Sequence, residues 1–142
     1  MTESRETIYD IVNGDEFFLK LVEIFYEKVA KDDVLQSMFH EGFEKPKHNL
    51  YLFLRKIFGG PDDYTPTRGH PMMRRRHLPF KIGLKERNRW MKLMLESLEE
   101  LHITNDHPAR APMEAYFQNV ATHMINQQVF AQDINEAGIG EL

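Results

Sequence analysis

Apolar residues recur at intervals of three and four along most of this chain, and this spacing constrains the fold more than any other feature. The first stripe consists of Phe18, Leu21, Val22, Phe25 and Val29. Three more occupy residues 50–58, 91–98 and 113–125. Each stripe matches one face of an α-helix at 3.6 residues per turn. No alternating apolar run with hairpin residues predicts a β-strand. We therefore predict an all-α protein.

Glycine and proline divide these stripes into separate helices. Gly14 ends a short first segment, and Asp15 is a candidate cap for the helix that follows. Residues 42–45 resemble a loop, and Pro46 suits the first turn of the next helix, where a missing N–H has no cost. The run Gly59-Gly60-Pro61 ends that helix.

The middle of the chain is expected to be irregular. Residues 62–71 read as a loop whose length suggests a functional role or an ordering ligand. Residues 72–77 can form only about one and a half helical turns, and Pro79 places His77 at the end of that short element. A longer helix is predicted from about Leu84 to Leu101.

Composition narrows the class of protein. The 142 residues are 42% hydrophobic, which suits one domain. A net charge of −4 gives no reason to expect a nucleic-acid partner, and no stretch has the roughly 20 apolar residues of a membrane span. The chain has no cysteine and no recognisable secretory signal. We expect a soluble cytoplasmic protein, monomeric or homodimeric.

Seven histidines are the most conspicuous chemical feature, but most lack a motif. They show no HExxH and no close pair that would indicate a zinc site. The chain also has no phosphate-binding glycine loop and no nucleophile elbow. These patterns give no positive sign of a hydrolase or a nucleotide-binding enzyme.

One histidine follows three cations, in the run Arg74-Arg75-Arg76-His77. A solvated basic turn is the ordinary interpretation. The alternative is a neutral imidazole directed at a metal, with arginines beside an anionic group. Heme satisfies the alternative, because its iron accepts an imidazole nitrogen and its propionates pair with basic side chains.

A resemblance to a known family decides between these interpretations. The motifs that carry it are Phe25-Tyr26, Phe39, Gly59-Gly60-Pro61, Tyr64, Arg68-Gly69-His70-Pro71, Arg76-His77-Leu78-Pro79-Phe80, Glu86-Arg87 and Trp90. In this order they resemble the group II truncated hemoglobins, over about residues 15–128. The resemblance implies a truncated two-over-two helical globin fold. We expect one globin domain over residues 1–142, with flexible tails outside that core.

The resemblance also implies roles on the proximal side of a heme b group. His77 matches the family's proximal histidine, whose second ring nitrogen is expected to donate to a nearby carbonyl group. Arg76 and Tyr64 match positions that usually face a propionate. Phe39 matches the aromatic residue that packs against the heme face.

On the distal side, Tyr26 and Trp90 match the family's hydrogen-bond donors. A phenolic O–H and an indole N–H can both donate to a bound diatomic ligand and slow its escape. Each residue lies one step off the apolar stripe of its helix, so neither need be ordinary core.

The helix that carries Pro46 would supply the rest of the distal wall, through Pro46, Leu50 and Phe53. Pro46 stands at the place aligned with the distal histidine of other globins and departs from the small residue that this family often has there. Proline offers no donor. A shift of one or two positions in the alignment would instead bring His48 toward the pocket. The sequence leaves both Pro46 and His48 as candidates for this distal position.

The function implied is binding of O₂, CO, NO or similar ligands at a five-coordinate iron. An alternative is a redox enzyme, such as a nitric oxide dioxygenase or a peroxidase, that uses a separate reductase. The same residues would serve both, so the chain is not assigned as an enzyme. A third possibility is a globin-like sensor, a class that usually carries an output domain.

Overall fold

The computed structural model describes residues 6–39, 41–68 and 81–126, and within these ranges all regular secondary structure is helical. The elements are α1 (Ile8–Ile11), α2 (Asp15–Ala30), the 3-10 helix η1 (Gln36–Met38), α3 (Glu44–Ile57), α4 (Tyr64–Arg68), α6 (Leu84–Glu100) and α7 (Arg110–His123). The predicted all-α class is confirmed. None of the described helices is long and apolar enough to cross a membrane.

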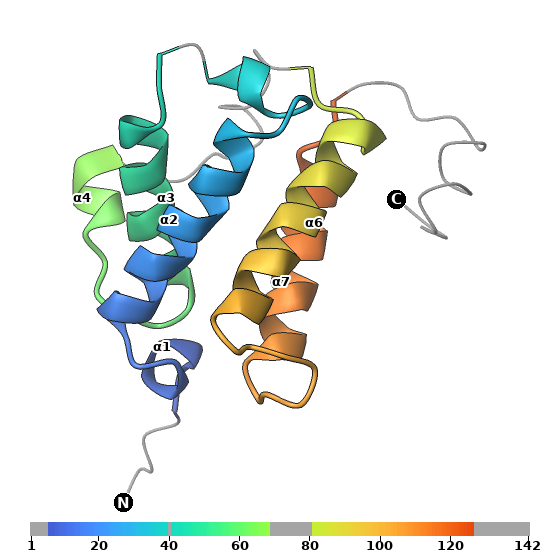
Figure 1. Ribbon diagram of the computed structural model, residues 1–142. Coiled ribbons are helices and arrows are strands. Elements are labelled where there is room, and N and C mark those ends of the chain that lie inside the picture. The colour runs from blue at the N-terminus through green and yellow to red at the C-terminus, as the bar shows by residue number, and fades with distance from the viewer. Residues whose placement is uncertain (1–5, 40, 69–80, 127–142) are drawn as a thin grey trace, which may run out of the picture.

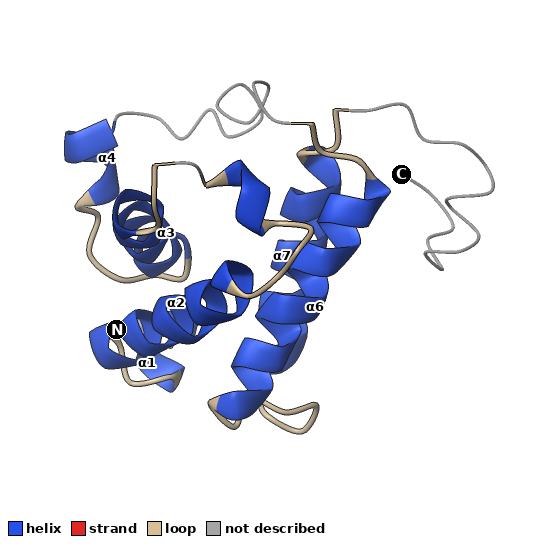
Figure 2. Ribbon diagram, turned by 45° about the horizontal axis from the view of Figure 1, so that its top comes forward, coloured by secondary structure: helices blue, strands red, loops and turns tan. Residues whose placement is uncertain are grey.

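Two helix pairs make up most of the described part of the chain. Helices α2 and α3 lie against each other, α6 and α7 form the second pair, and α2 packs on α6 to join the pairs (Figure 1). Figure 2, turned about the horizontal axis, keeps the same grouping and places η1 above the end of α2. The short helices α1 and α4 are attached at the periphery.

Aromatic side chains fill the core between the pairs. Phe18 of α2 is fully buried and stacks on Phe58 at 5.9 Å between ring centroids. Phe58 also meets Phe117 of α7 edge-on at 5.8 Å. Each such ring removes a large apolar area from water, so these contacts supply much of the driving force that holds α2, α3 and α7 together.

The starts of two helices differ from the prediction. Asp15 is not a cap: Gly14, with a φ of +69°, holds that place, and the Asp15 carboxylate instead accepts the Tyr9 hydroxyl and pairs with Arg55. Helix α3 begins at Glu44, so the expected loop over residues 42–45 is two residues too long. Pro46 still lies in the first turn of α3, as predicted.

The expected irregular stretch over residues 62–71 contains a helix. Residues Tyr64–Arg68 form α4, and the Asp62 carboxylate accepts the backbone N–H of Thr65 at 2.9 Å at its start. The prediction of a loop was wrong there, because five residues are too few to show a helical stripe. The glycines at 59 and 60 end α3 as predicted.

Candidate functional site

Three aromatic rings meet where α2, the segment after η1 and the start of α3 come together. Tyr26 of α2 contacts Phe39 edge-on at 5.6 Å between centroids and Phe43 at 6.0 Å. Phe39 and Phe43 lie 5.3 Å apart. Tyr26 is buried, whereas both phenylalanines are partly exposed. The three residues therefore form a wall with a phenol at its inner edge, which we call the Tyr26 cluster.

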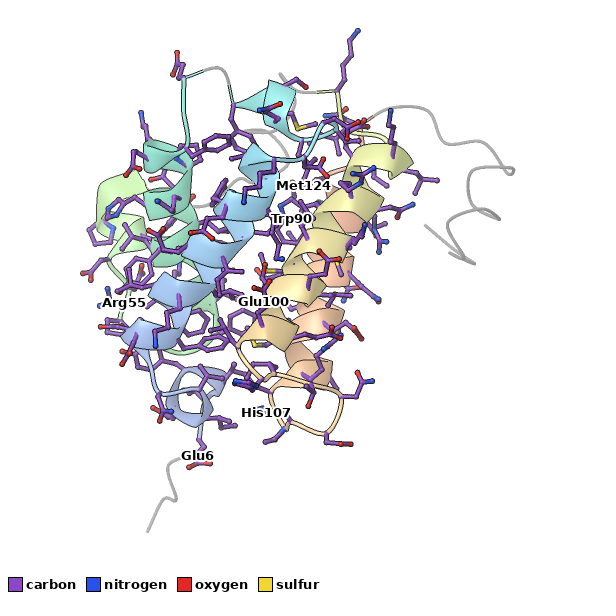
Figure 3. The ribbon with its side chains drawn as sticks, viewed as in Figure 1. Glu6, Arg55, Trp90, Glu100, His107 and Met124 are labelled. Atoms are coloured by element: carbon purple, nitrogen blue, oxygen red, sulfur yellow. The ribbon has the colours of Figure 1, made fainter. Side chains whose placement is uncertain are left out.

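Trp90 of α6 is linked to this cluster through Phe25. The Phe25 ring meets Tyr26 at 5.2 Å and Trp90 at 5.2 Å, both edge-on. Trp90 also contacts Phe117 of α7 at 5.7 Å. Figure 3 shows Trp90 on the side of α6 that faces α2. Two polar aromatic residues from different helices thus pack on the same buried phenylalanine.

Both residues keep a donor available. Neither the Tyr26 hydroxyl nor the Trp90 indole N–H makes a hydrogen bond to another described residue. Burial raises the pKa of the Tyr26 phenol, so this group stays protonated at neutral pH. A ligand on this face could supply an acceptor for either group.

The inner face of α3 continues the wall. Pro46 and Leu50 are partly buried and Phe53 is buried, at spacings of four and three residues. His48 is exposed, because two residues from Pro46 correspond to about half a turn of helix. Pro46 therefore shares one face of α3 with Leu50 and Phe53, and His48 does not.

Tyr64 closes one end of this face. It is buried at the start of α4, and its ring meets Phe53 at 5.4 Å. The two predicted residues from α3 and α4 are thus brought together. His77 and Arg76, predicted for the proximal side, lie within residues 69–80, outside the described part of the chain.

Two features of this region are not among the residues predicted from the sequence. Phe43 belongs to the Tyr26 cluster, and its spacing of three and seven residues from Pro46 and Leu50 could have placed it on the same face. The buried carboxylate of Asp32 accepts Nη1 of Arg89 at 2.6 Å, although the two residues are 57 positions apart. No local pattern predicts a pair so distant in the chain.

Comparison with known proteins supplies the family. The model of the bacterial-like globin family matches residues 7–126. The group 2 truncated hemoglobin YjbI of Bacillus subtilis is 32% identical over 127 residues, which are 89% of this chain and 94% of that protein. The chain belongs to the bacterial-like globins, among the group 2 truncated hemoglobins.

Solved structures agree with this assignment. The hemoglobin of Chloroflexus aurantiacus superposes with a TM-score of 0.82 and 41% identity, covering 87% of this chain and all of that one. The group II truncated hemoglobin of Bacillus anthracis gives a TM-score of 0.86 at 28% identity, and the superposition covers 93% of this chain and 100% of that one. The paired helices α2–α3 and α6–α7 are therefore the two-over-two globin arrangement expected from the sequence.

Heme is the cofactor that membership in a globin family implies. The described residues of this truncated hemoglobin fit it: the Tyr26 cluster and the inner face of α3 offer an apolar, aromatic surface suited to a flat ring. Tyr26 and Trp90 add two donors that have no acceptor among the described residues. Polar groups of this kind, few and placed within an apolar wall, are typical of ligand sites.

Proposed function

We propose that this truncated hemoglobin binds heme b through His77 and reversibly binds O₂ and related diatomic ligands on the opposite face. The observation that carries the proposal is the pair of available donors, Tyr26 and Trp90, which both pack on Phe25 in a globin fold. When bound, heme supplies an iron that is five-coordinate in the absence of a ligand and leaves one position for the diatomic molecule.

The residues of the chain would then act in three ways. Tyr26 and Trp90 donate hydrogen bonds to the ligand and slow its dissociation. Phe39, Leu50 and Phe53 exclude water, which strengthens these bonds. Pro46 offers no N–H and no side-chain donor, so retention of the ligand depends on the other two residues.

The proximal assignments carry over from the resemblance. His77 would ligate the iron, with its second nitrogen held by a carbonyl acceptor. Arg76 would pair with a propionate as a charged, bidentate donor. Tyr64 would add a neutral hydroxyl to the same region, with its ring anchored on Phe53.

Dissociation kinetics test the distal proposal. We expect Trp90→Phe and Tyr26→Phe each to speed O₂ dissociation at least severalfold in stopped-flow experiments, because each removes one donor of about 0.5–1.5 kcal/mol. Tyr116→Phe is the matched control, since it deletes a phenol from a partly buried ring of α7 that packs on Phe58 and Phe117. Unchanged rates in both distal variants would refute the proposal.

Oxygen storage and redox catalysis would use the same residues, so kinetics must separate them. The oxygenated protein is mixed with nitric oxide, with and without a reductase. Repeated turnover with the reductase would indicate a dioxygenase that depends on a partner protein, whereas a single stoichiometric reaction would leave ligand binding as the activity.

A further inference from the structure

The Asp32 carboxylate connects two segments that border the distal site. Its Oδ1 accepts the backbone N–H groups of Val34 and Leu35 at 2.9 and 3.0 Å. Its Oδ2 accepts Nη1 of Arg89 at 2.6 Å. The residue is only 7% exposed, so water competes little for these bonds. One carboxylate thus holds both the turn after α2 and helix α6.

Each end of this connection leads directly to a distal residue. The turn held by Oδ1 continues through η1 to Phe39, which packs on Tyr26. Arg89 immediately precedes Trp90 on α6. Tyr26 of α2 and Trp90 of α6 both pack on Phe25. The position of α6 relative to α2 near Phe25 therefore sets the distance between the Trp90 indole and a ligand that Tyr26 contacts.

A hydrogen bond is sensitive to small displacements. A donor and acceptor 2.9 Å apart interact well, but at about 3.6 Å the bond is lost. We propose that the Asp32–Arg89 ion pair is a positioning device that holds Trp90 at the distance needed to donate to the diatomic ligand. The inference rests on the proposed role of Trp90 as a distal donor.

The charges around the pair favour this geometry. Arg89 also lies 3.6 Å from Asp33, whose carboxylate is 92% exposed and contributes little. Asp32 is therefore the main anchor of the guanidinium. Lysine at position 89 would keep the charge but would lose the planar fork that fixes orientation.

A second ion pair between the same helices provides a control. Lys28 of α2 pairs with Glu100 of α6, at the far end of α6 from Trp90 (Figure 3). Lys28→Gln breaks a link between α2 and α6 whose acidic partner, Glu100, lies ten residues, about 15 Å, from Trp90 along α6. It should leave O₂ dissociation unchanged.

A double-mutant cycle on the heme-loaded protein tests the inference. We expect Arg89→Gln to speed O₂ dissociation roughly two- to tenfold, the range of one hydrogen bond. Arg89→Lys should fall between this variant and the wild type. In a Trp90→Phe background, Arg89→Gln should add nothing further, because the donor that it positions is gone.

A spectroscopic readout follows Trp90 itself. It is the one tryptophan in the chain, so 5-fluorotryptophan labelling gives a single ¹⁹F resonance. In the CO complex, Arg89→Gln should shift or broaden this resonance, whereas Lys28→Gln should not.

The outcomes separate the two proposals. If Trp90→Phe leaves the off-rate unchanged, the donor role of Trp90 falls and the positioning role falls with it. If Trp90→Phe speeds dissociation but Arg89→Gln does not, only the positioning role is overturned. An equal effect of Arg89→Gln in both backgrounds also overturns it, since Arg89 would then act independently of Trp90.

Discussion

Replacing Asp32 with alanine removes the acceptor of three hydrogen bonds at one buried point. The backbone N–H groups of Val34 and Leu35 lose their partner, and the Arg89 guanidinium loses its anchor. Asp32→Asn is the matched variant. Its amide oxygen can still accept the two backbone N–H groups, so it isolates the loss of charge.

The magnitudes follow from these partners. A hydrogen bond to a charged group contributes about 1.5–3 kcal/mol to stability. The bonds from the Val34 and Leu35 N–H groups share Oδ1 of Asp32, so each is taken at about 1.5 kcal/mol. The Arg89 side chain is 35% exposed, so its pair is discounted to under about 1 kcal/mol. Asp32→Ala should therefore lower the free energy of unfolding by about 3–4 kcal/mol, and Asp32→Asn by about 1 kcal/mol.

The pH dependence has a definite sign. Burial alone would raise the pKa of the Asp32 carboxyl, but the Leu35 N–H, the Arg89 guanidinium and the Val34 N–H together hold it below its usual value. The carboxylate therefore stabilises the fold fully above the unfolded pKa of about 3.9, and this stabilisation is lost as the pH falls below that value.

Urea unfolding of the heme-loaded protein at one fixed heme concentration, followed by circular dichroism, gives the comparison. The difference between wild type and Asp32→Asn should stay constant from pH 7 to pH 5. A difference that shrinks within this window would mean that the carboxyl titrates with a raised pKa. Equal stabilities of Asp32→Ala and wild type would refute the claim that the hydrogen bonds of Asp32 stabilise the fold.

Three further substitutions probe the fold. Gly59→Ala should destabilise the protein by about 1–3 kcal/mol, because φ is +102° there and the new Cβ would clash with the Thr7 side chain; urea unfolding measures this. Phe117→Ala should cost about 3–5 kcal/mol, since the ring is 2% exposed, and a melt followed by circular dichroism would show it. Lys20→Ala, which breaks an exposed pair with Glu16, should leave the melting temperature unchanged.

Helices with a long apolar stripe could be predicted from the sequence. The stripe from Phe18 to Val29 locates α2, and the predicted helix from Leu84 to Leu101 matches α6 to within one residue. The start of α3 could not be located, because its N-cap is Phe43, which makes no side-chain cap hydrogen bond. Helix α4 was missed because it is only five residues long.

Contacts between segments that are distant in the sequence could not be predicted from helical periodicity. The resemblance to a family named Tyr26 and Trp90, but their shared contact with the Phe25 ring is a result of how α2 packs on α6. The pairing of Asp32 with Arg89 depends on the same packing. A single sequence contains no periodicity that reports which residues meet across 57 positions.

The central claim is that the chain holds heme through His77, and one absorbance experiment tests it. The reduced protein should show a Soret band that shifts when CO is added. His77→Ala should lose this band, whereas His123→Ala, which alters an exposed histidine of α7, should keep it. Full heme retention with unchanged axial spectra in His77→Ala would contradict the account.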